Sequence, residues 1–413
     1  MTQAHNATSS IISDSISLQT IADDLAVISG TEHLRSDENT VSIAPANTEE
    51  IAAVLRYANR NSITVAPWGC GTKQSWGSPI RPSLILNTHR LNAVREHTWQ
   101  DMTCIVQAGC VWSGMQASLA KHGQFVALDP LWPDRATIGG IAATNDSGTL
   151  RLRYGSLRDL IIGMTIVLAD GTIARSGGKV VKNVAGYDLH KLMTGAFGTL
   201  GVITEVTFRL HSIPRHVQSF TIASEDVEPL GQLLMRILDS HLSTQSLQLR
   251  SNPSGFALDV RLATLPEVIR DQAAALSKLA GSVQLEATDA DSNVWNARQA
   301  LVDQAGSFVI KTTMLPSDIS AITAMVHSLG GTSVTQATGI MTANIPAAAS
   351  AQLEHLRQKL EAGRGSLTVL HHPVDAPHVA STVPSDTLPL MRELKHRFDP
   401  NRILNPGRFL GGI

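Results

Sequence analysis

The segment VAPWGCGTKQSWG (Val65–Gly77) runs from an apolar strand into a turn that contains three glycines. Gly69 and Gly71 let the main chain approach a ligand closely and present successive N–H groups to an anion. Thr72 adds a hydroxyl group, and Lys73 adds a positive charge that we expect at the rim. The spacing differs from the P-loop pattern GxxxxGK and from the dinucleotide pattern GxGxxG. Taken alone, the turn fits an anion site and a tight structural turn equally well.

Two further glycine-rich segments follow along the chain. ATIGGIAATNDSGTLRLRYGSLRDLIIG occupies residues 136–163, and GAFGTLGVITEV occupies residues 195–206. All three glycine clusters are poor in bulky side chains, and alternating strands around them can place the clusters on adjacent loops. Three clusters of this kind fit one long ligand that lies against the main chain, and a dinucleotide has that length.

The flanking segments predict a βαβ pattern. VSIAPAN (residues 41–47) is typical of a strand, and Asn47 with Glu50 predicts a capping box at the start of the following helix. The next strand leads directly into the opening turn. MTIVLADGTIARSG (residues 164–177) predicts a hairpin around a two-residue Asp170–Gly171 turn.

Motifs become sparse after Pro214, where alanine, serine and leucine dominate up to about Pro384. Helical and strand-like segments alternate in this region, which predicts a small α+β domain. No internal repeat is evident. The chain as a whole therefore has the pattern of an α+β fold.

Bulk composition excludes several classes of protein. Among 413 residues, 33 Lys and Arg stand against 35 Asp and Glu, so no basic nucleic-acid-binding face is expected. The three cysteines, Cys70, Cys104 and Cys110, form neither a CxxC pair nor a zinc spacing and indicate a reducing compartment. The N-terminus lacks the basic region of a secretory signal. The longest apolar run, LIIGMTIVLA (residues 160–169), is too short for a bilayer, which needs about 20 residues, so we expect no transmembrane segment.

The glycine clusters together resemble a known family. In the same order along the chain, they resemble the FAD-binding domain of the vanillyl-alcohol oxidase/p-cresol methylhydroxylase (PCMH) superfamily. The resembling segments are residues 69–73, 137–140 with Asn145 and Gly148, 153–155 with Asp159, and FGTLGVIT at 197–204. The tail RFDPNRILNPGRF (residues 397–409) resembles the C-terminal return segment of the superfamily. Within the superfamily, the chain is most like one group: KNVAGYDL (residues 182–189) is similar to the E-type FAD-binding subunits of glycolate oxidase.

The resemblance implies a division of the chain. It predicts a PCMH-type FAD-binding domain made of two α+β subdomains, with a smaller ferredoxin-like α+β cap domain. We place an N-terminal tail and helix at residues 1–36 and the FAD-binding domain at 37–214. The cap would occupy residues 215–384, and residues 385–413 would return to the FAD domain.

The resemblance also implies that backbone at the glycine clusters wraps the FAD diphosphate. The implied cofactor-binding residues are Pro67, Trp68, Gly69, Cys70, Gly71, Thr72, Lys73, Thr137, Ile138, Gly139, Gly140, Asn145, Gly148, Arg153, Tyr154, Gly155, Gly198, Gly201, Val202 and Ile203. Cys70 stands where the superfamily usually has glycine, and it would be strained if its φ were positive. No histidine lies in the opening loop, so we expect noncovalent FAD, with Cys70 as the only nearby nucleophile. Arg153 is expected to pair with Asp159.

The catalytic residues are less evident. The chain lacks the HxGDGNxH type of metal signature found in catalytic relatives, and we expect no metal. His372 in TVLHHPVD is one candidate for a residue that faces the flavin, although a loop or strand-end role fits it better. Lys182 and Tyr187 are the other candidates, expected near the isoalloxazine ring. Lys182 could stabilise the reduced flavin anion or form an ordinary ion pair.

The implied function is that of an FAD-binding subunit of a glycolate oxidase complex. Such a subunit takes part in oxidising glycolate or a similar small 2-hydroxy acid to the 2-oxo acid. The implied partners are a sister FAD-domain subunit and an iron–sulfur subunit, because this chain has no cysteine set for a cluster. Two alternatives stay open: a self-sufficient FAD-dependent oxidoreductase on another small hydroxyl substrate, and a non-catalytic flavoprotein subunit. The implied location is the cytoplasm, with any contact at the inner membrane made through partners.

Overall fold

The N-terminal part of the chain forms a small sheet. The computed structural model describes residues 16–179, 187–281, 286–288, 291–304, 306–373, 375–376, 379, 381–383 and 385–413. This first subdomain contains α1 (Leu18–Ser29), β1 (Leu34–Ser36), β2 (Val41–Ile43), α2 (Thr48–Arg60), β3 (Val65–Trp68) and β4 (Leu84–Asn87). The strand order is β1-β2-β4-β3, in which β2 and β3 run parallel to β4. Helix α1 and strand β1 pack into this subdomain, although both precede residue 37, where we placed the start of the domain.

Helix α2 begins where the sequence predicts. The Asn47 side chain accepts a hydrogen bond from the Glu50 backbone N–H at 2.8 Å. The Glu50 carboxylate accepts one from the Ala46 N–H at 2.8 Å, one residue earlier than in a standard capping box. The apolar face of α2, including Ile51 and Leu55, is buried, and this packing fixes the strand that leads into the opening turn.

The second subdomain is built on an antiparallel sheet of order β5-β6-β10-β8-β9. Its elements are β5 (Val94–Thr98), β6 (Thr103–Gln107), α3 (Trp112–Ala120), β7 (Gln124–Phe125), α4 (Ile138–Thr144), α5 (Arg151–Tyr154), α6 (Leu157–Leu160), β8 (Ile161–Val167), β9 (Ile173–Gly177), α7 (His190–Met193), β10 (Val202–Arg209) and β11 (His211–Ser212). The predicted β8–β9 hairpin is confirmed. The prediction of a two-residue turn is wrong, because the last paired residues of the two strands are Val167 and Ile173. Gly171 lies in this longer connection with a left-handed φ, and its N–H donates to Leu168 O at 2.9 Å.

The cap contains two copies of one arrangement. Its elements are β12 (His216–Ser224), α8 (Val227–Leu238), β13 (Thr244–Asn252), β14 (Gly255–Thr264), α9 (Ile269–Ala280), β15 (Glu286–Thr288), α10 (Asp291–Trp295), α11 (Ala297–Val302), β16 (Ser307–Thr313), α12 (Ile319–Ser328), β17 (Thr332–Gln336), β18 (Ile340–Pro346), α13 (Ser350–Ala362) and β19 (Ser366–His371). The sheet order, β15-β12-β14-β13-β17-β18-β16-β19, joins two ferredoxin-like β-α-β-β-α-β units edge to edge through β13 and β17. The chain therefore does contain a structural repeat, although none is visible in its residues.

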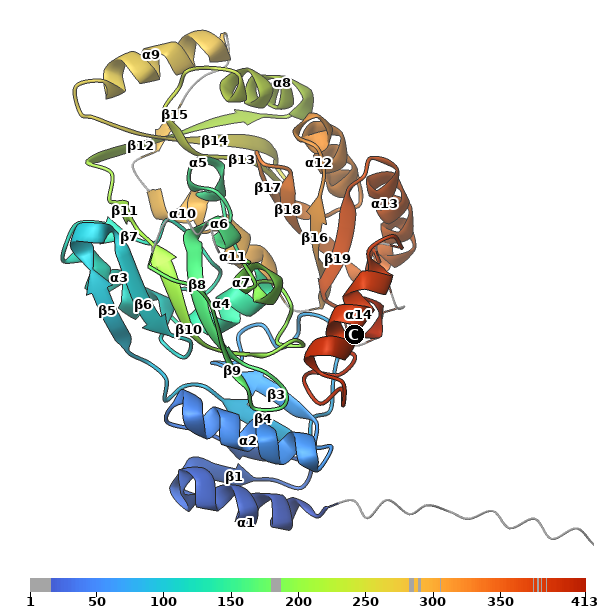
Figure 1. Cartoon of the computed structure of the whole chain (residues 1–413). Coiled ribbons are helices and arrows are strands. Elements are labelled where there is room, and N and C mark those ends of the chain that lie inside the picture. The colour runs from blue at the N-terminus through green and yellow to red at the C-terminus, as the bar shows by residue number, and fades with distance from the viewer. Residues whose placement is uncertain are drawn as a thin grey trace, which may run out of the picture.

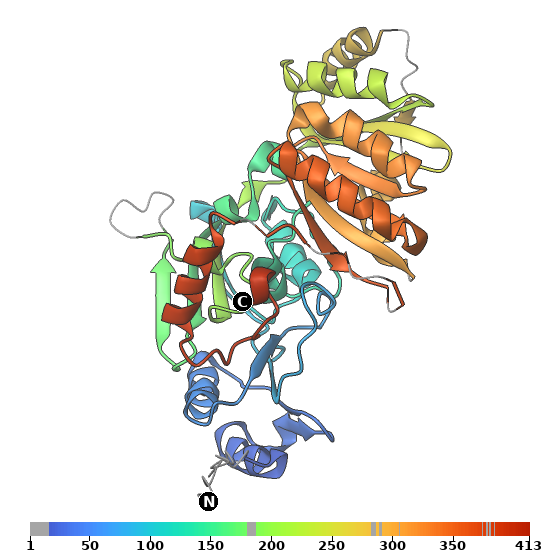
Figure 2. The same ribbon diagram turned by 90° about the vertical axis from the view of Figure 1, so that its right-hand side faces the viewer.

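The cap sheet separates its helices from the FAD domain. Helices α8, α9, α12 and α13 cover the outer face, and the other face looks toward the glycine-rich loops (Figures 1 and 2). Val309 and Leu370 from this inner face pack with Trp76, Leu131 and Trp132 of the FAD domain. This apolar contact holds the cap above the loops that follow β3 and precede α4.

The C-terminal segment returns to the first subdomain. Helix α14 (Leu388–Phe398) buries the Lys395 ammonium, which donates to Asp399 Oδ2 at 2.6 Å and to the carbonyls of Thr199 and Leu404, each at 2.8 Å. Leu404 then forms a parallel bridge with Val65 at the free edge of β3. The tail is therefore held beside the opening turn, as the red segment in Figure 2 shows.

Candidate cofactor and substrate site

The three glycine clusters meet at one cavity. Gly71, Gly140 and Gly198 all lie on its wall, together with most of the residues that we expected to hold the cofactor. The predicted residues that line this first cavity are Pro67, Trp68, Gly69, Cys70, Gly71, Thr72, Lys73, Thr137, Gly139, Gly140, Gly198, Gly201, Val202 and Ile203. The opening turn, the start of α4 and the loop before β10 thus form a continuous surface.

Two glycines of the opening turn are required by its geometry. A Cβ on Gly69 would lie 2.2 Å from Thr137 Oγ1, so the turn touches the start of α4 without room for a side chain. Gly71 has φ +72°, in the left-handed region. Cys70 between them is exposed and does not have a positive φ, so the strain considered from its sequence position is absent.

The opening turn presents a row of unused backbone donors. Among the described residues, none accepts a hydrogen bond from the N–H groups of Gly69, Cys70, Gly71, Thr72 or Lys73. Consecutive N–H groups in such a turn form an anion-binding concavity. By contrast, the first N–H groups of α4 are already satisfied, including the one of Gly140, which donates to Thr137 Oγ1 at 3.3 Å. The anion-binding capacity of this cavity therefore comes from the opening turn.

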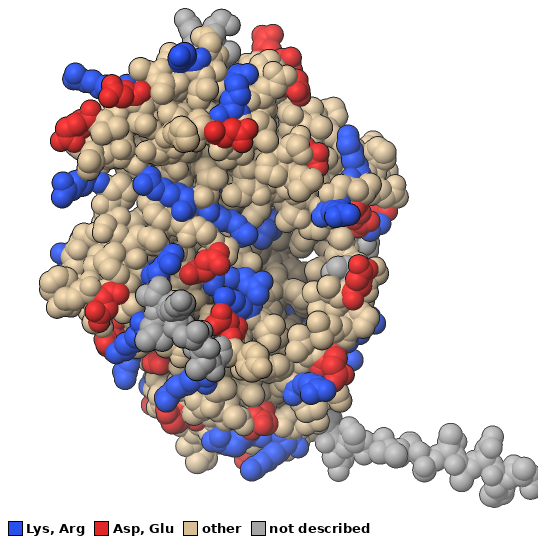
Figure 3. Space-filling model, turned by 45° about the horizontal axis from the view of Figure 1, so that its top comes forward, with Lys and Arg blue, Asp and Glu red and all other residues tan. Residues whose placement is uncertain are grey.

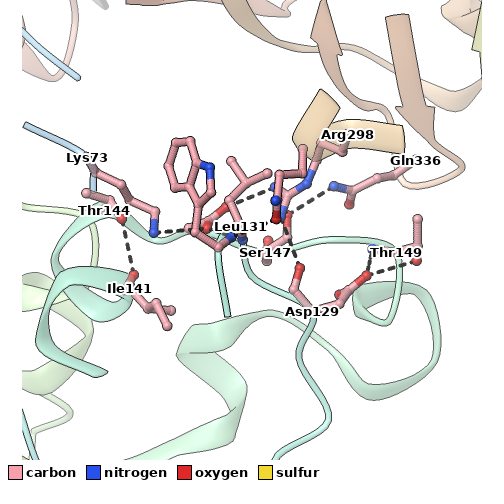
Figure 4. A network of polar contacts seen from close by, with 12 residues as sticks. Lys73, Asp129, Leu131, Ile141, Thr144, Ser147, Thr149, Arg298 and Gln336 are labelled. Atoms are coloured by element: carbon pink, nitrogen blue, oxygen red, sulfur yellow. Dashed lines mark hydrogen bonds and ion pairs between the residues drawn. The ribbon is translucent and has the colours of Figure 1, made fainter. Parts of the chain in front are cut away.

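Lys73 does not lie at the rim, as we expected. Its ammonium is buried 3.4 Å from Asp146 Oδ2, and Asp146 also accepts from Arg298 Nη1 at 2.9 Å (Figure 4). Burial lowers the pKa of Lys73, and Asp146 opposes this shift. Burial acts to raise the pKa of Asp146, but Arg298 and Lys73 outweigh it and hold that pKa at about 2. Because Arg298 belongs to α11, these charges connect the opening turn to the cap.

Arg298 carries the connection further. It donates to Ser147 O at 2.8 Å and to Asp129 O at 3.0 Å, and Gln336 Nε2 donates to the same Ser147 carbonyl at 3.1 Å (Figure 4). The Asp129 carboxylate accepts from the backbone N–H of Thr149 at 2.7 Å. The loop before α5 is thus fixed by side chains from both domains.

A second cavity of 760 Å³ adjoins the first, between the FAD domain and the inner face of the cap. Thr144, Phe197 and Arg408 line both cavities. The cap contributes, among others, Lys311, Thr313, Ser366, Thr368 and His372 to this second cavity. His372 Nδ1 lies 2.8 Å from Pro373 O, a contact in which Nδ1 carries the hydrogen and donates. The arrangement is an elongated site whose second part can hold a small molecule.

The C-terminal segment supplies site residues that we did not predict. Asn405 and Arg408 line the first cavity. The buried Arg408 guanidinium donates to Trp76 O at 3.4 Å and to Lys73 O at 3.1 Å, and burial lowers its pKa to about 10. Asn405 Nδ2 donates to Phe197 O at 2.7 Å. The only signal in the sequence was the NPGRF segment, which identified a returning tail but not its polar contacts.

Several predicted residues lie away from the first cavity. Ile138 is buried beneath it, Asn145 lines the second cavity, and Gly148 faces the Asp129 carboxylate beside a third cavity. Tyr187 has 89% of its surface exposed and lines none of these cavities. Lys182 lies outside the described residues.

Arg153, Tyr154 and Gly155 have a different place in the structure. Arg153 donates to Ala263 O at 2.7 Å, and the Tyr154 hydroxyl accepts from Gln245 Nε2 at 3.2 Å, so both join the FAD domain to the cap. The expected Arg153–Asp159 pair is wrong, because Asp159 instead accepts from Ser156 at the start of α6. Gly155 ends α5 with φ +87°. These residues therefore contribute to the packing of the two domains and to the end of α5. They were predicted as ligand contacts because they lie in a glycine-rich segment.

Neither a membrane-spanning helix nor a metal-binding group is present among the described residues. No helix among them has the length and apolar character needed to cross a membrane. No group of three or more His, Cys, Asp or Glu in this part of the chain is placed to hold a metal ion.

Comparison with known proteins agrees with this geometry. Residues 40–177 match a family model described as an FAD binding domain, and residues 330–409 match one described as the C-terminal domain of FAD linked oxidases; together they cover more than half of the chain. The chain is 28% identical to a glycolate oxidase subunit GlcD of Bacillus subtilis over 89% of this chain and 88% of the relative. It is 26% identical to a D-2-hydroxyglutarate dehydrogenase of Xanthomonas citri over 90% and 89%.

The fold has a close counterpart among solved structures. A substrate-bound p-cresol methylhydroxylase superposes with a TM-score of 0.73 over 94% of this chain and 96% of the other, at 15% identity. At that identity the likeness concerns the fold, and it matches the two subdomains and the cap described above. The chain therefore contains an FAD binding domain and the C-terminal domain of FAD linked oxidases, and it is a flavoprotein, an FAD-dependent oxidoreductase with a PCMH-type FAD-binding fold.

Proposed function

We propose that this protein oxidises a small 2-hydroxy acid to the 2-oxo acid, using noncovalent FAD. The observation that carries the proposal is the pairing of two cavities. The first is lined by five backbone N–H groups that no described residue uses as donors, and the second is closed by the cap and contains Lys311 and His372. Relatives matched over most of their length are a glycolate oxidase subunit and a D-2-hydroxyglutarate dehydrogenase, which supports a 2-hydroxy acid as substrate.

The residues of the first cavity fit the FAD diphosphate. The N–H groups of the segment 69–73 would donate to its phosphate oxygens, because nothing in the described chain uses them and a Cβ at Gly69 would close the cradle. Gly198 and Ile203 would lie along the same ligand. Cys70 is exposed on the wall and its backbone angle is ordinary. Bound FAD supplies the two-electron acceptor that this oxidation needs.

His372 is our candidate for the group that takes the hydroxyl proton. Its Nδ1–H donates to Pro373 O, which fixes the ring tautomer and orients Nε2. It lines the second cavity, whereas Tyr187 is exposed at the surface and Lys182 lies outside the described residues. A general base must reach the reacting hydroxyl within hydrogen-bond distance, so His372 is the first residue to test.

We further propose that the chain works as a subunit of a glycolate oxidase complex. In this proposal electrons leave through a sister FAD-domain subunit and an iron–sulfur subunit, because the three cysteines of this chain are dispersed and two are buried. The protein would lie in the cytoplasm and reach the inner membrane through those partners. A self-sufficient dehydrogenase is the second candidate, favoured by the match to a D-2-hydroxyglutarate dehydrogenase over 89% of that relative.

One experiment separates these readings. The purified chain, loaded with FAD, is mixed anaerobically with glycolate, D-lactate, D-2-hydroxyglutarate and their L counterparts, and flavin bleaching is followed in a stopped-flow instrument. We expect rapid bleaching by one of these acids and slower bleaching in His372→Gln with FAD retained. No bleaching by any acid, either alone or in complexes recovered by native co-purification, would refute the proposed function. Bleaching without turnover on artificial acceptors would favour the subunit over the self-sufficient enzyme.

A further inference from the structure

Strand β16 presents a lysine to the second cavity. Alternation along the strand places Phe308 and Ile310 in the cap core beneath the helices. Val309 faces the opposite way and packs at the junction with the FAD domain. Lys311 and Thr313 continue this inward row and line the second cavity. The side chain of Lys311 therefore points toward the space beside the cofactor site.

The Lys311 ammonium has no partner among the described residues. It makes no hydrogen bond, and no described carboxylate lies within ion-pair distance of it. Asp146 is the acid whose charge acts on Lys311, but Asp146 already forms ion pairs with Lys73 and Arg298. Burial lowers the pKa of Lys311, and the nearby Arg298 adds to this shift while Asp146 opposes it. A half-buried cation that faces a cavity without a partner is available to an anion that enters the cavity.

The wall of the second cavity has one sign of charge. Among the described residues, no Asp or Glu lines it, whereas Lys311 and Arg408 do. The Arg408 guanidinium already donates hydrogen bonds to the carbonyls of Trp76 and Lys73. The space-filling view shows Lys and Arg side chains beside a hollow between the two domains (Figure 3). Of the cations that line this cavity within the described part of the chain, Lys311 is the one that an anionic ligand would find without a partner.

We propose that Lys311 binds the carboxylate of the substrate and so selects anionic over neutral hydroxy compounds. The inference rests on the proposed function, because it assumes that the second cavity holds the substrate. Lys311 would donate to a carboxylate oxygen, while the Thr368 hydroxyl on the same wall offers a further hydrogen bond. The rest of the substrate would then extend toward Phe197, which lines both cavities.

Binding of oxalate tests this site without any turnover. Oxalate carries a carboxylate like a 2-hydroxy acid but has no hydrogen on carbon to lose, so the FAD-loaded protein can be titrated by calorimetry or by flavin absorbance. We expect Lys311→Met to weaken oxalate binding about 10- to 100-fold and Lys311→Arg to retain most of it. Lys278→Met is the matched control, because Lys278 is exposed on the outer helix α9. Glycolamide, a neutral analogue, should bind equally to wild type and Lys311→Met.

The outcomes also separate this inference from the proposed function. A Lys311→Met protein that keeps its FAD and melting temperature yet binds oxalate like wild type overturns the inference, as does a wild type that binds no oxalate. If Lys311 controls oxalate binding but no 2-hydroxy acid bleaches the flavin, the anion site stands and the proposed reaction fails. If an acid bleaches the flavin and Lys311→Met leaves its KM unchanged, the reaction stands and Lys311 has no part in selecting it.

Discussion

Replacing Gly69 by alanine should empty the cofactor site while leaving the fold intact. The added Cβ would lie 2.2 Å from Thr137 Oγ1, about 1 Å or more inside normal contact. One way out is rotation of Thr137, which removes the cap of α4 and costs about 1 kcal/mol. The other is displacement of the opening turn, which moves its N–H groups away from the phosphates. Each hydrogen bond to a charged group is worth about 1.5–3 kcal/mol, so losing two weakens FAD binding about 100-fold or more.

The assay is a titration of apoprotein with FAD, followed by quenching of flavin fluorescence. Gly114→Ala is the control, since a Cβ at Gly114 in α3 meets nothing within 4 Å, and its affinity should stay at the wild-type value. In the double variant Gly69→Ala/Thr137→Ala, the severe contact with Oγ1 is gone, so part of the lost affinity should return. A Gly69→Ala protein that binds FAD within twofold of wild type would refute the view that this turn holds the diphosphate.

Four further predictions follow from named groups. Asp146→Asn leaves buried cations unpaired and should lower the free energy of unfolding by about 3–5 kcal/mol in denaturant titrations, whereas the exposed Asp134→Asn should change it by less than about 0.5 kcal/mol. Because the pKa of Asp146 in the folded protein is about 2, below its ordinary value, ionised Asp146 adds about 2 kcal/mol to the free energy of unfolding above pH 4, and this amount is lost as the pH falls toward 2. The free energy of unfolding of Asp146→Asn should lack this part of the acid dependence. In alkylation followed by mass spectrometry, the exposed Cys70 should react and be protected by FAD, while the buried Cys104 and Cys110, whose thiol pKa values are raised by burial, should not; equal labelling of all three would contradict the burial. Acid precipitation should release all flavin into the supernatant, and flavin left in the pellet would show a covalent link.

The sequence predicts well which residues line the first cavity, because much of its wall is backbone. A main-chain cradle needs glycine at fixed places, and glycine is visible in the sequence at Gly69, Gly71, Gly140 and Gly198. The same logic explains the errors. A glycine is needed at position 155 because helix α5 ends there with a left-handed backbone, and the sequence pattern could not distinguish this need from that of a ligand contact.

The side chains that complete the site were harder to predict. Lys73 sits in the opening turn, and only the folded position of Asp146 reveals that its ammonium turns inward instead of toward the rim. Lys311 and Arg408 are single cations in segments without a motif, brought to the site by the cap strand and by the returning tail. The repeat in the cap is a matter of strand order, which residue patterns do not encode directly.

Hydrogen exchange at the opening turn tests the central claim most directly. Mass spectrometry of a peptide that covers residues 69–73 compares the protein with and without FAD. If the diphosphate takes these unused N–H groups, their exchange should slow strongly on FAD binding, while a peptide from α13 on the outer face of the cap stays unchanged. Saturating FAD that leaves exchange at residues 69–73 as fast as in the apoprotein would contradict the account.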